Sequence, residues 1–146
     1  MLLIIGYGNT LRSDDGVGPR VAEAVMGLRL PAVEALSCPQ LTPELSEPIS
    51  RARLVIFVDA AVDSPRDVQF RKIAPADSSQ IMAHAADPRT MLALSRDVFG
   101  HAPAAWLLTI PVTNIGIGED LSPFAQSGFS IGLRKVQALV SQHFGS

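Results

Sequence analysis

Three aspartates in two segments that follow apolar runs could supply carboxylates for metal or acid–base chemistry. Asp14 and Asp15 lie in the segment 6–18, GYGNTLRSDDGVG, and Asp59 follows the apolar run at residues 54–58. One aspartate is enough to cap a helix, so the adjacent pair suggests a further role for one of them. Asp59 alone has an ordinary explanation, since aspartate accepts hydrogen bonds from the N–H groups of turns.

The aspartates could form a metal site if the strands that precede them, at residues 2–5 and 54–58, are neighbours in the sheet. Both loops then open at the same edge of a sheet, and two carboxylates face each other across one crevice. Their repulsion would raise the pKa of one of them, and a divalent cation would remove that cost.

His84 is the histidine that fits a third ligand. It lies between the expected fourth strand and a helix start at Asp87, and the dozen residues from Lys72 are long enough to return to the carboxylate edge. Two aspartates and a neutral imidazole suit zinc, nickel, manganese or iron, and they leave coordination positions open. His143 is expected at the surface, and no role is assigned to His101.

Two other kinds of site are less well supported. Residues 6–11 resemble the start of a dinucleotide fingerprint, but Leu11 replaces the third glycine, and the carboxylates of Asp14 and Asp15 would repel a pyrophosphate. Cys38, the single cysteine, precedes a proline with no histidine nearby in sequence, and there is no GxSxG motif. We therefore expect Cys38 to be inert, and nucleotide binding remains the weaker alternative.

Composition limits the class of protein. The 146 residues are 47% hydrophobic and 18% charged, with a net charge of −2. These values predict a single folded domain over residues 1–146, with no electrostatic footprint for nucleic acid or an anionic membrane. The first apolar run is too short for a membrane span and has no basic flank, so we expect a cytoplasmic protein. We also expect it to be a monomer.

Strands and helices alternate along the sequence, which predicts an α/β fold: a three-layer α/β/α sandwich around a five-stranded mixed sheet. The fourth strand follows the third too closely for a helical crossover and is therefore expected to be antiparallel. The expected strands are residues 2–5, 32–36, 54–58, 68–73 and 106–110.

Helix starts are indicated by capping residues and prolines. The expected helices begin at Val17, at Thr42 (ending near Ile49), at Asp87 with Pro88, and at Ser122 with Pro123. Their expected apolar faces include Met91, Leu92, Ser95 and Val98 in the third helix and Ile131, Leu133, Val136 and Val140 in the fourth.

These motifs together resemble the nickel–iron hydrogenase maturation proteases. The resemblance rests on segment 6–18, the turn VIFVDA at 55–60, the single His84 before a helix, and the late segment 118–123. It implies a five-stranded mixed sheet with an antiparallel fourth strand, and a ligand set of Asp15, Asp59 and His84. It also implies an aspartyl-type endopeptidase that removes a C-terminal extension from the precursor of the hydrogenase large subunit, once that partner carries nickel.

The sequence departs from that family's pattern in two places. Residues 38–45 stand where many relatives have a glycine-rich segment, and together with residues 104–106 they resemble the branch that serves bidirectional, NAD-linked hydrogenases. The acidic pair is Asp-Asp rather than Asp-Glu, which shortens the ligand arm of Asp15 by one methylene group. A non-catalytic nickel-binding maturation chaperone with the same three ligands is the alternative from another functional class.

Overall fold

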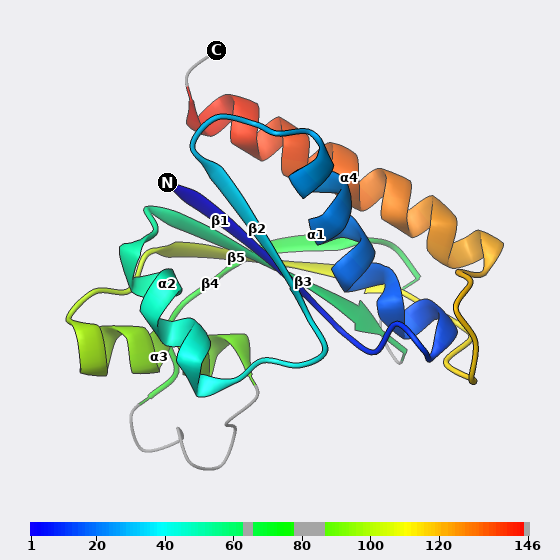
Figure 1. Ribbon diagram of the computed structural model, residues 1–146, viewed down its shortest axis with the longest axis horizontal. Helices are drawn as coiled ribbons and strands as arrows, with labels where there is room; N and C mark the ends of the chain where they lie inside the picture. The colour runs from blue at the N-terminus through cyan, green and yellow to red at the C-terminus, as the bar shows by residue number, and fades with distance from the viewer. Residues whose placement is uncertain (63–65, 78–86, 145–146) are drawn as a thin grey trace.

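A single five-stranded sheet forms the centre of the protein (Figure 1). The computed structural model describes residues 1–62, 66–77 and 87–144. The strand order is β2-β1-β3-β5-β4, with all neighbours parallel except β4, which is antiparallel to β5. This confirms the predicted mixed sheet. The strands are β1 (Leu2–Tyr7), β2 (Val33–Cys38), β3 (Leu54–Ala61), β4 (Gln69–Ile73) and β5 (Ala104–Pro111).

Helices cover both faces of the sheet, which confirms the three-layer arrangement. In Figure 1, α1 and α4 lie on one side of the sheet and α2 and α3 on the other. None of the helices in the described ranges combines the length and apolar character that a membrane crossing needs. The α-helices are α1 (Val17–Gly27), α2 (Ser46–Arg51), α3 (Pro88–Phe99) and α4 (Pro123–His143), and short 3-10 turns η1 (Ser13–Gly16) and η2 (Pro43–Leu45) precede α1 and α2.

The apolar run of β1 is continuous because both faces of this strand are buried. Leu2 and Ile4 pack in the layer under α1 and α4, whereas Leu3 and Ile5 pack in the layer under α2 and α3. All four side chains are fully buried. A central parallel strand has no solvent-facing side, so it carries no polar alternation.

Three predictions about helices were wrong in detail. The helix expected at Thr42 starts as the 3-10 turn η2, and Thr42 makes no side-chain cap, so α2 begins only at Ser46. Val98 is 65% exposed and Ile131 is 38% exposed. In α4 the buried side is formed instead by Ala125, Gly128, Gly132, Val136 and Val140. Its two glycines allow α4 to lie close against Ile110 of β5.

Asp59 lies inside β3, whereas the sequence had suggested that it follows the strand. Strand β3 continues to Ala61 because β5 offers pairing partners that far: Asp59 pairs with Thr109, and Ala61 with Pro111. A strand conformation alternates its side chains, so it determines the face on which the carboxylate of Asp59 lies.

Candidate functional site

The ends of β1 and β3 define the candidate site. The two strands are neighbours, with Gly6 of β1 opposite Val58 of β3. Strand β2 lies on the other side of β1, so the sheet order reverses between β1 and β3, which is where open α/β sheets bind ligands. The next residues along the two strands are Tyr7 and Asp59, whose parity places both on the face covered by α2 and α3.

Glycines of the first motif bring the start of α1 onto these strand ends. A Cβ atom at Gly18 would lie 2.6 Å from the carbonyl oxygens of Tyr7 and Val58. A Cβ atom at Gly8, whose φ is +149°, would lie 2.1 Å from the carbonyl oxygen of Asp15. These glycines are thus explained by close backbone approach. The helix that a dinucleotide would need at Leu11 begins only at Val17, after η1.

The negative charge of Asp15 acts on Asp59, which is the repulsion between carboxylates that the sequence analysis expected. The side chain of Asp15 is partly exposed and accepts a hydrogen bond from the backbone N–H of Asn9 at 2.7 Å. Burial, and then the negative charge of Asp15, raise the pKa of Asp59 from 3.8 to about 6. Hydrogen bonds from Tyr7 and from the backbone N–H of Ala60 oppose this shift without cancelling it. Among the described residues, no cation contributes to the pKa of Asp59.

Tyr7 is a site residue that the sequence analysis missed. Its phenol donates a hydrogen bond to Asp59. Burial and the nearby charge of Asp59 raise the pKa of Tyr7 well above its ordinary value of 10.0, so the phenol stays protonated and remains a donor. The sequence placed Tyr7 two residues beyond the expected first strand, and its partner Asp59 lies 52 residues further along the chain.

Asp14 stabilises the fold, although its neighbour Asp15 belongs to the candidate site. It is fully buried and accepts hydrogen bonds from the backbone N–H groups of Thr113 at 3.1 Å, Asn114 at 3.0 Å and Ser122 at 2.7 Å, and from the Ser122 hydroxyl at 2.7 Å. Burial opposes its ionisation, but these donors outweigh burial and hold the pKa of Asp14 below its ordinary value. Asp14 therefore joins η1 to the loop before α4, which leaves Asp15 as the carboxylate of the pair that faces Asp59.

The predicted third ligand, His84, lies outside the described residues. Among the described residues, no three side chains of the metal-ligating types come together. The chain re-enters the described part at Asp87, the N-cap of α3, and the charge of Asp87 contributes to the raised pKa of Tyr7. His143 is exposed, as predicted, and His101 contacts the carbonyl oxygen of Ala52 at 3.3 Å through Nε2.

Cys38 ends β2 beside Tyr7, but it does not have the surroundings of a nucleophile. Burial raises the pKa of its thiol, which keeps the sulfur protonated and weakly reactive. The thiol of Cys38 donates to the carbonyl oxygen of Gly6, at 3.9 Å from the sulfur.

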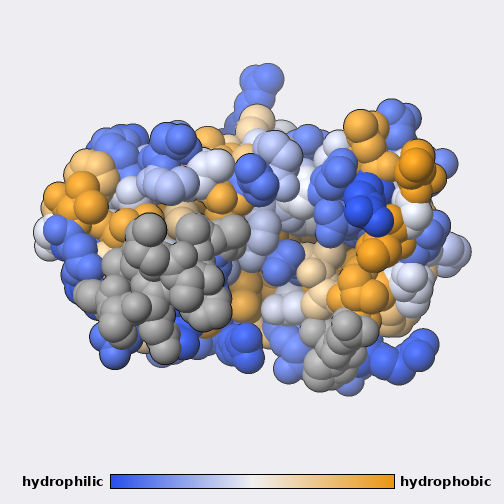
Figure 2. Space-filling model, turned by 90° about the horizontal axis from the view of Figure 1, so that it is seen from below, coloured by the Kyte–Doolittle hydropathy of each residue, from blue (hydrophilic) through white to orange (hydrophobic). Residues whose placement is uncertain are grey.

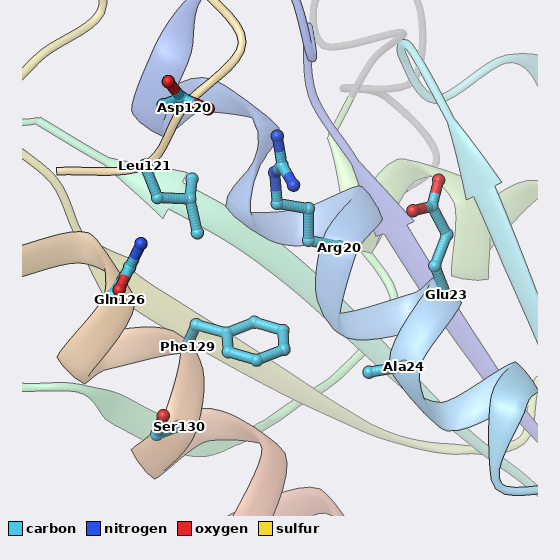
Figure 3. Close-up of a pocket in the computed structure, with 8 residues that line it drawn as sticks. All are labelled: Arg20, Glu23, Ala24, Asp120, Leu121, Gln126, Phe129 and Ser130. Carbon is cyan, nitrogen blue, oxygen red and sulfur yellow. The ribbon is translucent and has the colours of Figure 1, made fainter. Parts of the chain in front are cut away.

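Two hollows lie next to the candidate site. One, of about 380 Å³, is lined by the segment 8–11 together with Cys38 and Glu23. The other, of about 600 Å³, lies between α1 and α4 and also includes Glu23 (Figure 3). Figure 3 shows Arg20 of α1 pointing toward the segment that carries Asp120 and Leu121. Asp15 and Asp59 line neither hollow, so the larger one is not the place of the carboxylate chemistry.

These observations define a class of structure. It is an open α/β sheet with two carboxylates at the point where the strand order reverses, between β1 and β3. No protein-family profile matches the sequence, and no curated protein matches it either. Solved structures do match, and the fold is that of the hydrogenase maturation proteases.

Three of these structures cover nearly the whole chain. The hydrogenase maturating endopeptidase HybD from E. coli is 21% identical over 99% of this chain and 93% of its own, with a TM-score of 0.77. The NiFe hydrogenase maturation protease HycI from Thermococcus kodakarensis is 23% identical over 92% and 88%, with a TM-score of 0.72. A hydrogenase 2 maturation peptidase from a Thaumarchaeota archaeon is 19% identical over 99% and 97%, with a TM-score of 0.69. These three likenesses confirm the predicted fold.

Proposed function

We propose that the protein is an endopeptidase that removes a C-terminal extension from the nickel-loaded precursor of a nickel–iron hydrogenase large subunit. The observation that carries the proposal is the pair Asp15 and Asp59, in which the charge of one raises the pKa of the other, where the strand order of the sheet reverses. Several solved structures that share the fold are hydrogenase maturation endopeptidases or proteases by name, which supports the same reaction class.

The two carboxylates suit a cation that arrives with the substrate. Two carboxylates in mutual repulsion gain more from a divalent ion than two isolated ones, because the ion relieves the repulsion as well as pairing with each charge. Oxygen ligands with one imidazole suit nickel, which is bound by nitrogen and oxygen donors. We assign the recognition of substrate nickel to Asp15, Asp59 and His84.

The assignment of His84 rests on the reach of the chain. His84 lies three positions before Asp87, and three residue steps span at most ~11 Å. Since the charge of Asp87 acts on Tyr7, a histidine three positions earlier has the reach to join the carboxylates. Its neutral imidazole would bring the protein's share of the ligands to three.

Asp59 is also suited to a role in hydrolysis. A carboxylate with a pKa of about 6 is a stronger base than an ordinary aspartate and is still largely ionised at neutral pH. With the substrate's scissile bond held beside the pair, Asp59 or Asp15 would accept a proton from the attacking water. Tyr7 would keep the carboxylate of Asp59 in one orientation during this step.

The proposal is tested by incubating the protein with a hydrogenase large-subunit precursor, both nickel-loaded and nickel-free, and recording intact masses. An endopeptidase shortens the nickel-loaded precursor by its C-terminal extension and releases that peptide. A non-catalytic nickel chaperone would bind nickel and precursor and leave the mass unchanged. Retention of full-length, nickel-loaded precursor at equimolar protein would therefore contradict the proposal.

A further inference from the structure

Two asparagines make the same set of hydrogen bonds, one beside each of the adjacent aspartates Asp14 and Asp15. The backbone N–H of Asn9 donates to Asp15 Oδ2 at 2.7 Å, and that of Asn114 donates to Asp14 Oδ2 at 3.0 Å. In each asparagine, the side-chain Oδ1 accepts from the backbone N–H two residues further along, which makes an Asx turn. The two turns can therefore be compared directly, because only Asp15 belongs to the candidate site.

Asn9 closes the loop between β1 and η1 with groups of its own. Its Oδ1 accepts from the N–H of Leu11 at 2.9 Å, and its carbonyl oxygen accepts from the N–H of Arg12 at 3.0 Å. The carbonyl oxygen of Arg12 in turn accepts from the N–H of Asp15 at 3.1 Å. Asn9 and Asp15 are thus held together at the two ends of one short loop.

The bond from Asn9 occupies one oxygen of the Asp15 carboxylate. An ionised carboxylate has two oxygens, and each of them can accept hydrogen bonds. The distance of 2.7 Å is typical of a hydrogen bond to a charged acceptor, which is stronger than one between neutral groups. No donor within residues 1–62, 66–77 and 87–144 contacts Asp15 Oδ1. That oxygen is therefore available to the nickel of the substrate or to water.

Neither asparagine side chain contributes to the core, because both are exposed. Figure 2 shows hydrophilic and hydrophobic residues interspersed over the side of the molecule seen from below, so exposure alone does not distinguish either residue. Water can replace Oδ1 of Asn9 as the acceptor for the N–H of Leu11, so folding stability depends little on that bond. The consequence of losing Oδ1 therefore falls on the direction of the loop.

We infer that Asn9 is a positioning residue for Asp15: its side chain fixes the loop so that its own backbone N–H holds one carboxylate oxygen and leaves the other free. The inference rests on the proposed function for the reaction in which Asp15 takes part. Asn9 contacts Asp15 and not the scissile bond. It acts through orientation, and a small misplacement of a reacting group lowers a rate strongly.

The test compares Asn9→Ala and Asn9→Ser with the matched control Asn114→Ala. Serine is included because its hydroxyl accepts the same turn hydrogen bond more weakly than asparagine does. The readouts are kcat/KM for cleavage of the nickel-loaded precursor, Kd for the nickel-free precursor, and the melting temperature. Hydrogen exchange of the backbone amide of residue 9 is recorded by NMR in the metal-free protein, since this readout needs no cleavage.

We expect Asn9→Ala to lower kcat/KM by about tenfold and to reduce the exchange protection of the residue 9 amide by about tenfold. Asn9→Ser should fall between Asn9→Ala and the wild type in both values. Kd for the nickel-free precursor and the melting temperature should not change, because Asp15 is proposed to act through the nickel. Asn114→Ala should lower the melting temperature, because it loosens the loop held by Asp14, and leave kcat/KM within about twofold of the wild type.

Unchanged kcat/KM or unchanged amide protection in Asn9→Ala would overturn the inference. An equal loss of kcat/KM in Asn114→Ala, or an equal loss of affinity for the nickel-free precursor in Asn9→Ala, would also overturn it, since either result indicates a general loop defect. Failure of the wild type to cleave the nickel-loaded precursor would instead contradict the proposed function. The amide protection of residue 9 would then still decide whether the Asn9 side chain fixes the contact with Asp15.

Discussion

The phenol of Tyr7 donates a hydrogen bond to the carboxylate of Asp59 across the two neighbouring strands β1 and β3. This contact gives Asp59 a fixed partner on one side while Asp15 repels it from another. One neighbour therefore orients the carboxylate and another repels it. The contact with Tyr7 follows from the register of β1 and β3, and the repulsion follows from the position of Asp15 in η1.

Titration of Asp59 in the metal-free protein should follow from this arrangement. The pKa of Asp59 is raised from 3.8 to about 6, so the native state holds this proton more tightly than the unfolded chain. The resulting stabilisation is complete below pH 3.8 and is lost as the pH rises through 6. Relative to Asp59→Asn, the wild type should lose on the order of 2 to 3 kcal/mol of unfolding free energy across that interval. Urea unfolding at a series of pH values measures this difference, and parallel profiles would contradict the shift.

Tyr7→Phe should move the pKa of Asp59 further upward. The hydrogen bond from Tyr7 favours the ionised carboxylate, and phenylalanine removes the donor while retaining the ring. Carbon-13 NMR of the carboxyl groups in metal-free protein would measure the shift. A lower pKa for Asp59 in Tyr7→Phe would show that the phenol does not stabilise the anion.

Asp14→Asn should destabilise the protein much more than Asp15→Asn. Asp14 is fully buried among donors, and an amide would turn its NH₂ group toward at least one of them. Unpaired buried donors and the lost charge should reduce the unfolding free energy by about 3 kcal/mol, against less than about 1 kcal/mol for Asp15→Asn. Chemical denaturation compares the two variants directly. Equal stability would contradict the structural role of Asp14.

Much of this arrangement could be predicted from the sequence. The continuous apolar runs before Gly6 and Asp59 predict central strands, and helix starts such as Ser122 with Pro123 carry local capping signals. The proximity of Asp15 to Asp59 was predicted on one condition, that the first and third strands are neighbours, and the sheet meets it.

Other features depend on contacts that no local pattern encodes. Asp14 and Asp15 are the same residue type at adjacent positions, and only the loop at 113–122 makes one of them an anchor. Val98 has helical spacing, but α3 ends at the edge of its apolar layer, so the side chain remains exposed. The length of β3 was underestimated because it depends on the partner strand β5.

Cys38→Ser should retain full processing of the nickel-loaded precursor, because the proposed chemistry needs no thiol. The raised pKa of the thiol already argues against a thiolate at this position. Intact-mass analysis of a precursor coexpressed with the variant measures this. Complete loss of cleavage by a folded Cys38→Ser protein would favour a nucleophilic mechanism instead.

His84→Ala should weaken binding of the nickel-loaded precursor far more than binding of the nickel-free one. The imidazole is proposed to act only through the substrate's nickel, so its contribution disappears when the metal is absent. Pull-down titrations with both precursor forms measure the two affinities. An equal loss for both forms would show that His84 acts through protein contacts rather than through nickel.

The most direct test of the account is the cleavage of one nickel-loaded precursor by the wild type, Asp15→Asn and Asp59→Asn, followed by intact mass. Circular dichroism shows whether each variant is folded, and the nickel-free precursor serves as the matched control. The account predicts that the wild type trims only the nickel-loaded form and that both folded variants leave it at full length. Trimming of the nickel-free precursor by the wild type, or full trimming by both variants, would contradict the claim that Asp15 and Asp59 act together on the substrate's nickel.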